Sequence, residues 1–361
     1  MIEENRKREY LIPALIVVIM IYGIFAITSA VAGDTYHRGY PFRQLIWDLL
    51  AMLFMFLTVK LSRNILRDIA LVLYLLSILL LVFVLFKGPS VGGSRRWIDL
   101  GAVSFQPSEL AKLSLIVLLP IFLSNPTLKN ILLSTILTVV PMVLVVREPD
   151  LGTTVLLGFI WFSIFVASKV PLKWIIVLII VIALVIPIFY MFGLKSYQRK
   201  RIEAFLNPEE YSMSAAYNVI QSIHAIGSGG LFGKGYMKGT ANLLDFVPVE
   251  YSDFIVAVIG EELGFLGVLG LIVLYSSLIF RFRSIYTYIV DEYWKLVIIG
   301  VGATFFFHVA ENLLMCVGWA PVTGIPLPFV SYGGSSALIF GIMIGLVMKA
   351  YAVSQIGREV K

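Results

Sequence analysis

Long apolar stretches alternate with short polar connections along almost the whole chain. A transmembrane helix needs about 20 predominantly apolar residues to cross a hydrocarbon core of about 30 Å. Because lipid offers the backbone no hydrogen-bond partner, each such stretch is interpreted as a helix. The pattern therefore predicts an all-α polytopic membrane protein with about ten transmembrane helices, at 10–31, 42–59, 65–86, 107–124, 131–146, 153–167, 174–192, 253–280, 294–317 and 335–350.

Composition supports this interpretation and excludes several kinds of site. Of the 361 residues, 59% are hydrophobic and 14% are charged, whereas soluble domains carry about 25% charged residues. Cys316 is the one cysteine, and the three histidines are far apart in sequence. No disulfide framework, zinc constellation or Cys-His pair is expected. The segment SGGLFGK begins with Ser228 where a P-loop needs glycine, and Gly235 follows it where a P-loop needs Ser or Thr, so no nucleotide is expected as a partner. No nucleic acid is expected as a partner either.

Positive charge predicts the orientation in the membrane. Ten spans place both termini on one side, and Lys and Arg of short loops favour the cytoplasmic side. We therefore expect cytoplasmic termini, on the side that carries Arg6, Lys7, Arg8, Lys60, Arg63, Arg67, Lys129, Lys169, Lys173, Arg281, Arg283, Lys295, Lys349, Arg358 and Lys361.

The longest polar segment, residues 193–252, falls on the outer side between the seventh and eighth predicted helices. Long loops inside compact domains are commonly functional. The aromatic and aliphatic residues within this segment predict short amphipathic helices that lie against the membrane.

Basic residues also gather on the outer side, against the usual insertion bias. They could contact phospholipid head groups. Alternatively, they could bind a phosphate or diphosphate, for which arginine is well suited. The residues concerned are Arg95, Arg96, Arg199, Lys200 and Arg201.

Ionisable residues inside predicted spans are costly in lipid and normally face a partner or a cavity. Glu109 and Lys112 lie one helical turn apart. They could form a structural ion pair or line a cavity. His308, Glu311 and Asn312 share one helix face, which favours hydrogen bonding between helices.

Asp253 is the first residue of the eighth predicted helix and has two possible roles. It could stabilise the N-terminus of a helix, or it could serve as a base. Glu261 and Glu262 lie about 12 Å further along a regular helix. That separation exceeds the roughly 5 to 9.5 Å of glycosidase carboxylate pairs. A single base suits sugar transfer from a lipid diphosphate, whose leaving group needs charge stabilisation more than protonation.

Four segments resemble the SEDS family (shape, elongation, division and sporulation), and within the last of them VTGIPLPFVSYGGSS resembles RodA-type members more than FtsW-type members. The four segments are RRWIDLGAVSFQPSELAK, REPDLGT, FVPVEYSDFIVAVIGEELGFLG and APVTGIPLPFVSYGGSS. The resemblance covers nearly the whole chain and implies a single SEDS-type domain over residues 1–361, in the bacterial cytoplasmic membrane. It implies an inverting peptidoglycan glycosyltransferase that polymerises lipid II outside that membrane for cell elongation and shape. Undecaprenyl diphosphate is released.

The resemblance also implies a partner, a cofactor and site residues. A class B penicillin-binding protein would cross-link the undecaprenyl-linked glycan, and a divalent cation, Mg or Mn with unknown ligands, would assist. Asp253 falls on the family's essential aspartate, while Glu109 and Lys112 fall on its polar pair. Arg95 and Arg96 fall on its basic outer loop; their separate roles stay open. The chain departs from the family pattern at Tyr251, where many members have histidine.

Two other functions are compatible with the sequence. A lipid II flippase would also need polar groups across the bilayer, and a membrane scaffold would need only a docking surface. The segment GIPLPFVSYGG, with Pro326 and Pro328, could be a rigid turn or a wall of a lipid-binding groove.

Overall fold

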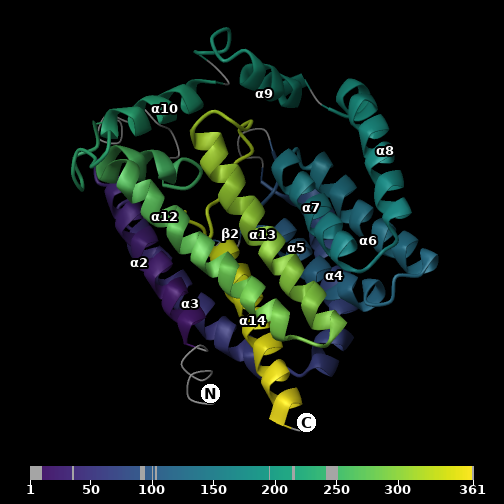
Figure 1. Ribbon diagram of the computed structural model, residues 1–361. Helices are drawn as coiled ribbons and strands as arrows, with labels where there is room; N and C mark the ends of the chain where they lie inside the picture. The colour runs from purple at the N-terminus through teal and green to yellow at the C-terminus, as the bar shows by residue number, and fades with distance from the viewer. Residues whose placement is uncertain are drawn as a thin grey trace.

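The computed structural model describes residues 10–34, 36–89, 94–99, 101, 104–194, 196–213, 216–240 and 251–359. It is almost entirely helical (Figure 1). The elements are α2 (Leu11–Ala30), α3 (Tyr40–Lys60), α4 (Arg63–Lys87), β1 (Ile98–Asp99), β2 (Ser104–Phe105), α5 (Pro107–Leu123), α6 (Leu128–Arg147), α7 (Leu151–Ala167), α8 (Leu172–Ile188), the π-helical turn Phe189–Gly193, α9 (Ser196–Leu206), α10 (Tyr217–Gly229), α12 (Ile255–Tyr288), α13 (Glu292–Cys316) and α14 (Gly334–Glu359).

Each of the ten predicted apolar stretches forms a helix. Among the described residues, seven helices are long and apolar enough to cross a membrane, and α7 and α8 are apolar but shorter. The number of ten spans therefore stays a prediction. The polar segment 193–252 contains the expected short helices α9 and α10, and its residues 241–250 lie outside the described residues.

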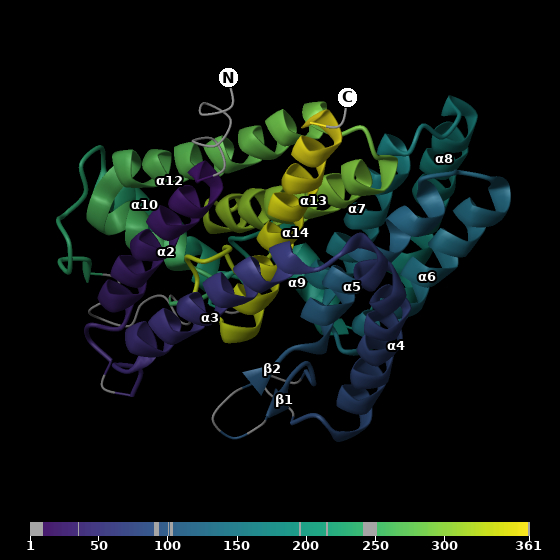
Figure 2. The same ribbon diagram turned by 90° about the horizontal axis from the view of Figure 1, so that it is seen from below.

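The centre of the bundle is built from α5, α13 and α14. Every residue of α5 from Pro107 to Pro120 is buried, including the charged Glu109 and Lys112, so this helix is surrounded by the others on all sides. By contrast, α8 has largely exposed side chains and lies at one edge (Figure 1). The antiparallel hairpin β1–β2 lies next to α4 and α5 (Figure 2). It leads directly into the first turn of α5.

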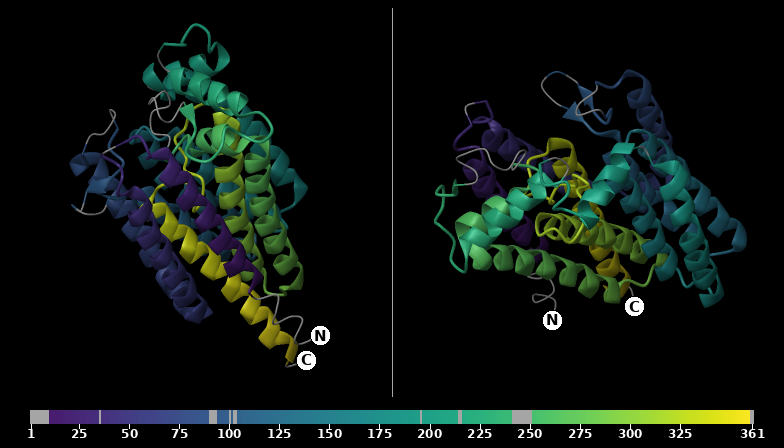
Figure 3. Two further views of the ribbon diagram at one scale, coloured as in Figure 1. Left: turned by 90° about the vertical axis from the view of Figure 1, so that its left-hand side faces the viewer. Right: turned by 90° about the horizontal axis from the view of Figure 1, so that it is seen from above.

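Helices α3 and α14 pack closely along their length, and two glycines allow this. A Cβ atom at Gly341 would lie 2.4 Å from the Ala51 carbonyl oxygen, and one at Gly345 would lie 2.5 Å from that of Met55. Small residues four positions apart let membrane helices approach each other in this way. The beginning of α2 and the end of α14 share one end of the bundle, opposite α9 and α10 (Figure 3).

The prediction of one uninterrupted helix over 253–280 is wrong at Gly264, where the backbone of α12 leaves helical geometry with φ of 66° and ψ of −163°. The backbone of residues 230–235 packs there, with the Phe265 amide bonded to the Gly230 carbonyl at 2.9 Å. Glu261 accepts hydrogen bonds from Thr240, and Glu262 accepts them from Met237 and Gly239. Both glutamates therefore anchor the loop before the break.

Candidate active site

Asp253 lies in the turn of residues 251–254 that precedes α12, and its side chain is partly buried. Among the described residues, its carboxylate accepts a hydrogen bond from the Ser252 hydroxyl, at 3.2 Å. The N-cap of α12 is Phe254, and that helix end has no side-chain cap bond. The geometry thus gives no support to a capping role and leaves the carboxylate available for chemistry.

Residues 322–326, between α13 and α14, form the wall beside Asp253 and are called the 322–326 segment. A Cβ atom at Gly324 would lie 3.1 Å from Asp253 Oδ2, and Gly324 has a positive φ of 74°. Side chains from α9 and α13 hold the other four residues of the segment. Arg201 Nη1 on α9 donates to the Val322 carbonyl at 3.1 Å. From α13, the Glu311 carboxylate accepts from Thr323 Oγ1, and Asn312 Nδ2 donates to the Ile325 carbonyl at 2.9 Å. His308 Nδ1, also on α13, bonds the Pro326 carbonyl at 2.8 Å.

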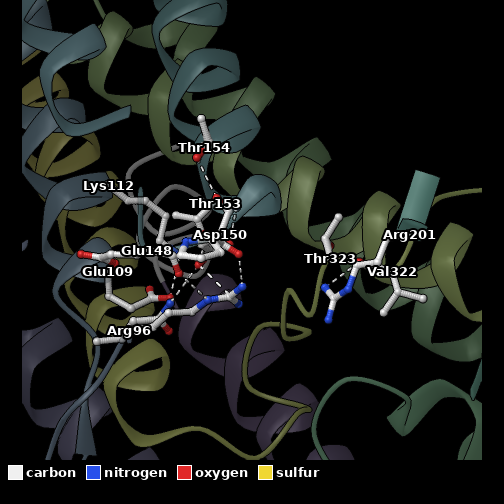
Figure 4. A network of polar contacts seen from close by, with 12 residues as sticks. Arg96, Glu109, Lys112, Glu148, Asp150, Thr153, Thr154, Arg201, Val322 and Thr323 are labelled. Carbon is white, nitrogen blue, oxygen red and sulfur yellow. Dashed lines mark hydrogen bonds and ion pairs between the residues drawn. The ribbon is translucent and has the colours of Figure 1, made fainter. Parts of the chain in front are cut away.

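A second group of polar contacts surrounds the connection between α6 and α7. Asp150 is the N-cap of α7 and accepts hydrogen bonds from the Thr153 amide at 3.1 Å and hydroxyl at 2.9 Å. Arg96 donates to the carbonyls of Glu148 and Pro149 and pairs with Asp150 at 3.9 Å. Figure 4 shows Arg96 reaching this connection and Arg201 reaching Val322. The two groups bring both arginines toward Asp253.

The electrostatics of the site follow from this mixture of charges. Burial raises the pKa of Asp253 above its ordinary value, and the negative charge of Asp150 raises it further. The hydrogen bond from Ser252 and the positive charges of Arg201 and Arg96 lower this pKa. Burial, together with the charge of Asp150, raises the pKa of Glu148 to about 9 despite Arg96. Glu148 is therefore a neutral acid at pH 7, whereas Asp253 has two cations to stabilise its charged form.

Glu109 and Lys112 form the predicted ion pair in the interior of the bundle. Lys112 Nζ lies 2.7 Å from Glu109 Oε1, and their side chains are 1% and 3% exposed, respectively. Lys112 also lies 3.2 Å from His308 Nε2. Both side chains of the pair are thus closed off from the surface in this structure. It connects α5 to α13.

The structure separates the five basic residues that the sequence grouped together. Arg96 and Arg201 lie within the electrostatic reach of Asp253. Arg95 contacts the Phe86 carbonyl at 3.4 Å, and Arg199 contacts that of Met191 at 2.6 Å. Lys200 is exposed. The charges of Arg96 and Arg201 thus act on Asp253, and a diphosphate-binding role for Arg95, Arg199 and Lys200 stays a prediction.

Sequence reasoning did not assign a role to Asp150, although it lies in one of the segments that carry the family resemblance. Its position directly before a helix was the available signal. It also missed the surroundings of Tyr251, whose ring centroid lies 5.0 Å from that of His37. A histidine does lie beside this position, but it comes from the α2–α3 connection, which sequence spacing cannot reveal.

A divalent cation was expected from the resemblance. Within the described residues, no group of three or more His, Cys, Asp or Glu side chains could hold a metal ion. Mg²⁺ does not require such a cage, because substrate phosphates and one or two carboxylates commonly bind it. The described residues therefore fit a cation that substrate phosphates hold together with one or two carboxylates.

The fold and the site define a polytopic helical membrane protein with a partly buried carboxylate, Asp253, whose charged form two arginines stabilise. The family model described as Cell cycle protein, covering FtsW, RodA and SpoVE, matches residues 9–355. The chain belongs to this family.

Named relatives agree with this membership. The peptidoglycan glycosyltransferase MrdB of Escherichia coli is 36% identical over 341 residues, which cover 93% of this chain and 91% of that protein. Peptidoglycan glycosyltransferase RodA of Treponema pallidum is 29% identical, with coverage of 95% and 97%.

Solved structures have the same fold. A chain from a peptidoglycan synthase complex that coordinates polymerization and crosslinking matches with a TM-score of 0.82 at 31% identity, covering 95% of this chain and 97% of that one. The rod shape determining protein RodA of Thermus thermophilus matches with a TM-score of 0.71 at 30% identity, covering 95% and 96%.

Proposed function

We infer that this protein is a peptidoglycan glycosyltransferase that polymerises lipid II into glycan strands for cell elongation and shape. Family membership and the names of its relatives support this activity. The observation that carries the mechanism is the Asp253 carboxylate, which is partly buried, not used as a helix cap, and stabilised in its charged form by the charges of Arg201 and Arg96.

Asp253 is the general base of the proposed reaction. It accepts the proton of the GlcNAc 4-hydroxyl of the acceptor, whose oxygen forms a bond to the anomeric carbon of the donor glycan. The bond from that carbon to the diphosphate breaks, and undecaprenyl diphosphate leaves with the electron pair. Direct displacement converts the α-linked donor into a β-1,4 product with inversion.

Arg96 and Arg201 stabilise the departing diphosphate. A guanidinium stays charged and matches phosphate oxygens in geometry. Both arginines are themselves positioned by backbone carbonyls, Arg96 by those of Glu148 and Pro149 and Arg201 by that of Val322. Preorganised charge of this kind lowers the barrier because it needs no rearrangement during the reaction.

A divalent cation, Mg²⁺ or Mn²⁺, is part of the proposal. It would be bound chiefly by the substrate diphosphate, where it would neutralise negative charge. Titrating EDTA-treated protein with Mn²⁺ by electron paramagnetic resonance, with and without lipid II, tests this. Binding without substrate would contradict a substrate-bound cation.

Asp253→Asn tests the base directly, because it keeps the size of the side chain and a carbonyl oxygen for Ser252. General-base assistance is typically worth about 10² to 10⁴-fold in rate, so glycan synthesis by the purified chain should fall by at least that factor while lipid II binding persists. Glu262→Gln is the matched control on the same helix, because Glu262 bonds Ser29 and the 237–239 loop rather than the site. Near wild-type synthesis by Asp253→Asn would exclude this base.

A lipid II flippase is the competing function. The buried polar groups that a flippase needs are Glu109, Lys112 and His308, and in this structure they bond one another and are at most 3% exposed. Lipid II supplied to the purified chain in detergent distinguishes the two functions. A polymerase forms glycan chains there, whereas flipping can be observed only in sealed vesicles.

We also propose a class B penicillin-binding protein as partner and an extracytoplasmic site, with both termini in the cytoplasm. A structural relative is part of a synthase complex that couples polymerization to crosslinking. Arg201 of α9 bonds Val322 in the segment beside Asp253, and α9 lies at the bundle end opposite the beginning of α2 and the end of α14 (Figure 1). Co-purification with the transpeptidase should raise glycan synthesis, and equal rates with and without it would remove the partner from the mechanism.

A further inference from the structure

A chain of buried polar contacts runs from the middle of the bundle to the wall beside Asp253. It begins at Glu109 on α5, whose carboxylate accepts from Lys112 Nζ at 2.7 Å. Lys112 Nζ lies 3.2 Å from His308 Nε2, and His308 Nδ1 lies 2.8 Å from the Pro326 carbonyl oxygen. All three side chains are at most 3% exposed.

The partners of His308 determine its protonation. A carbonyl oxygen can only accept a hydrogen bond, so Nδ1 must carry a proton. An ammonium group can only donate, so Nε2 must carry a lone pair. His308 is therefore a neutral imidazole in a single tautomer, and both of its nitrogens are in use. Its orientation is fixed from both sides.

Asn312, one turn along the same helix, connects this arrangement to the aspartate. Its Nδ2 lies 2.9 Å from the carbonyl oxygen of Ile325 and 2.9 Å from that of Asp253. One side chain thus joins the backbone of the aspartate to the 322–326 segment. Between these two attachments lies Gly324, where a Cβ atom would be only 3.1 Å from the Asp253 carboxylate.

Stability alone gives little reason for such a chain. Buried ion pairs are often no better for stability than apolar residues of similar volume, and charged groups inside a membrane bundle are costly. Apolar side chains at 109, 112 and 308 would pack the interior but would remove the His308 bond to the Pro326 carbonyl and so release that end of the 322–326 segment.

We propose that His308 is a positioning residue for Asp253. With Lys112 behind it and Asn312 beside it, it fixes the 322–326 segment against the carboxylate and so sets the position of the base relative to the sugar hydroxyl. This inference rests on the proposed role of Asp253. His308 itself touches no reacting atom.

The test compares His308→Leu with His308→Gln in the purified full-length chain supplied with lipid II. Leu fills the space without hydrogen bonds, whereas the Gln amide can donate to Pro326 and accept from Lys112. A misplacement of about 1 Å can cost about 10²-fold in rate. His308→Leu should therefore lower kcat by roughly that factor with an unchanged KM, and His308→Gln should recover most of it.

The matched control is Thr304→Val. Thr304 lies one turn earlier on α13, is fully buried, and bonds the Gly300 carbonyl of its own helix at 2.8 Å. It should keep wild-type kcat and KM. If His308→Leu does not yield folded protein, Gly324→Ala is tested in its place. The Cβ atom of the new alanine displaces the 322–326 segment from Asp253. This variant too should lower kcat with KM unchanged.

Wild-type kcat in His308→Leu, or in Gly324→Ala where that variant is needed, overturns the inference. Equal loss in the Leu and Gln variants, or a loss expressed in KM, also overturns it. These results leave the proposed function intact, since the wild-type chain still polymerises. A wild-type chain that makes no glycan would instead remove the proposed function, and the inference with it.

Discussion

Lys112→Met separates the stabilising role of the buried ion pair from any role in the reaction. The two charges are 2.7 Å apart with at most 3% exposure, so at an effective dielectric constant of about 20 their attraction is about 6 kcal/mol before desolvation is subtracted. Removing one partner of a buried pair typically costs about 3 to 5 kcal/mol, because the other charge stays buried and unpaired. We expect Lys112→Met to lower the free energy of unfolding by that amount.

The double variant Glu109→Gln, Lys112→Met leaves no buried charge at the pair. Its free energy of unfolding should return to within about 1 kcal/mol of wild type, because neutral replacement of a whole buried pair is often tolerated. Glycan synthesis should stay low, since His308 Nε2 has lost its donor. Unfolding in SDS-containing mixed micelles and a lipid II polymerisation assay measure the two quantities.

Two results would refute this reasoning. A double variant as unstable as Lys112→Met would show that the unpaired charge is not the cause of the loss. A double variant with full stability and full activity would show that the pair serves the fold alone. In that case the connection through His308 would have no bearing on the reaction.

Two further predictions follow from the charges and the exposure of the described residues. Because Asp253 must be ionised to accept a proton, the rate of glycan synthesis should fall as pH drops through the raised pKa of Asp253. Arg201→Gln removes a charge that lowers this pKa, so the acid limb of the pH–rate profile should move to higher pH. Asp150→Asn removes a charge that raises this pKa, so the acid limb should move to lower pH. Shifts in the same direction would contradict this electrostatic account. Met213 and Val290 are 91% and 81% exposed. In a Cys316→Ser background, an impermeant thiol reagent on intact cells should label the variant Met213→Cys but not the variant Val290→Cys. The reverse labelling pattern would invert the proposed topology.

Much of the fold could be predicted because lipid restricts the backbone so strongly. Each long apolar stretch had to be helical to satisfy its own hydrogen bonds, and all ten stretches are helices. The break in α12 could not be predicted, because Gly264 adopts a positive φ only where residues 230–235 pack against it. Glycine permits that conformation, but only the tertiary contact requires it.

The candidate site divides in the same way. The sequence by itself determined the kinds of residue available: a lone Asp253, arginines on the outer side, a Glu109–Lys112 pair at helical spacing, and three polar residues on one face of α13. These follow from local spacing and from the cost of charge in lipid.

Only the tertiary structure decided which of these residues act together. It brings the charges of Arg96, Arg201 and Asp150 to bear on Asp253, and it directs His308 and Asn312 onto the 322–326 segment. The residues that meet at Asp253 come from the β1–β2 hairpin region, the α6–α7 connection, α9 and α13, far apart in the chain. Helical periodicity determines which residues share a face of one helix, but packing between distant helices determines which faces meet.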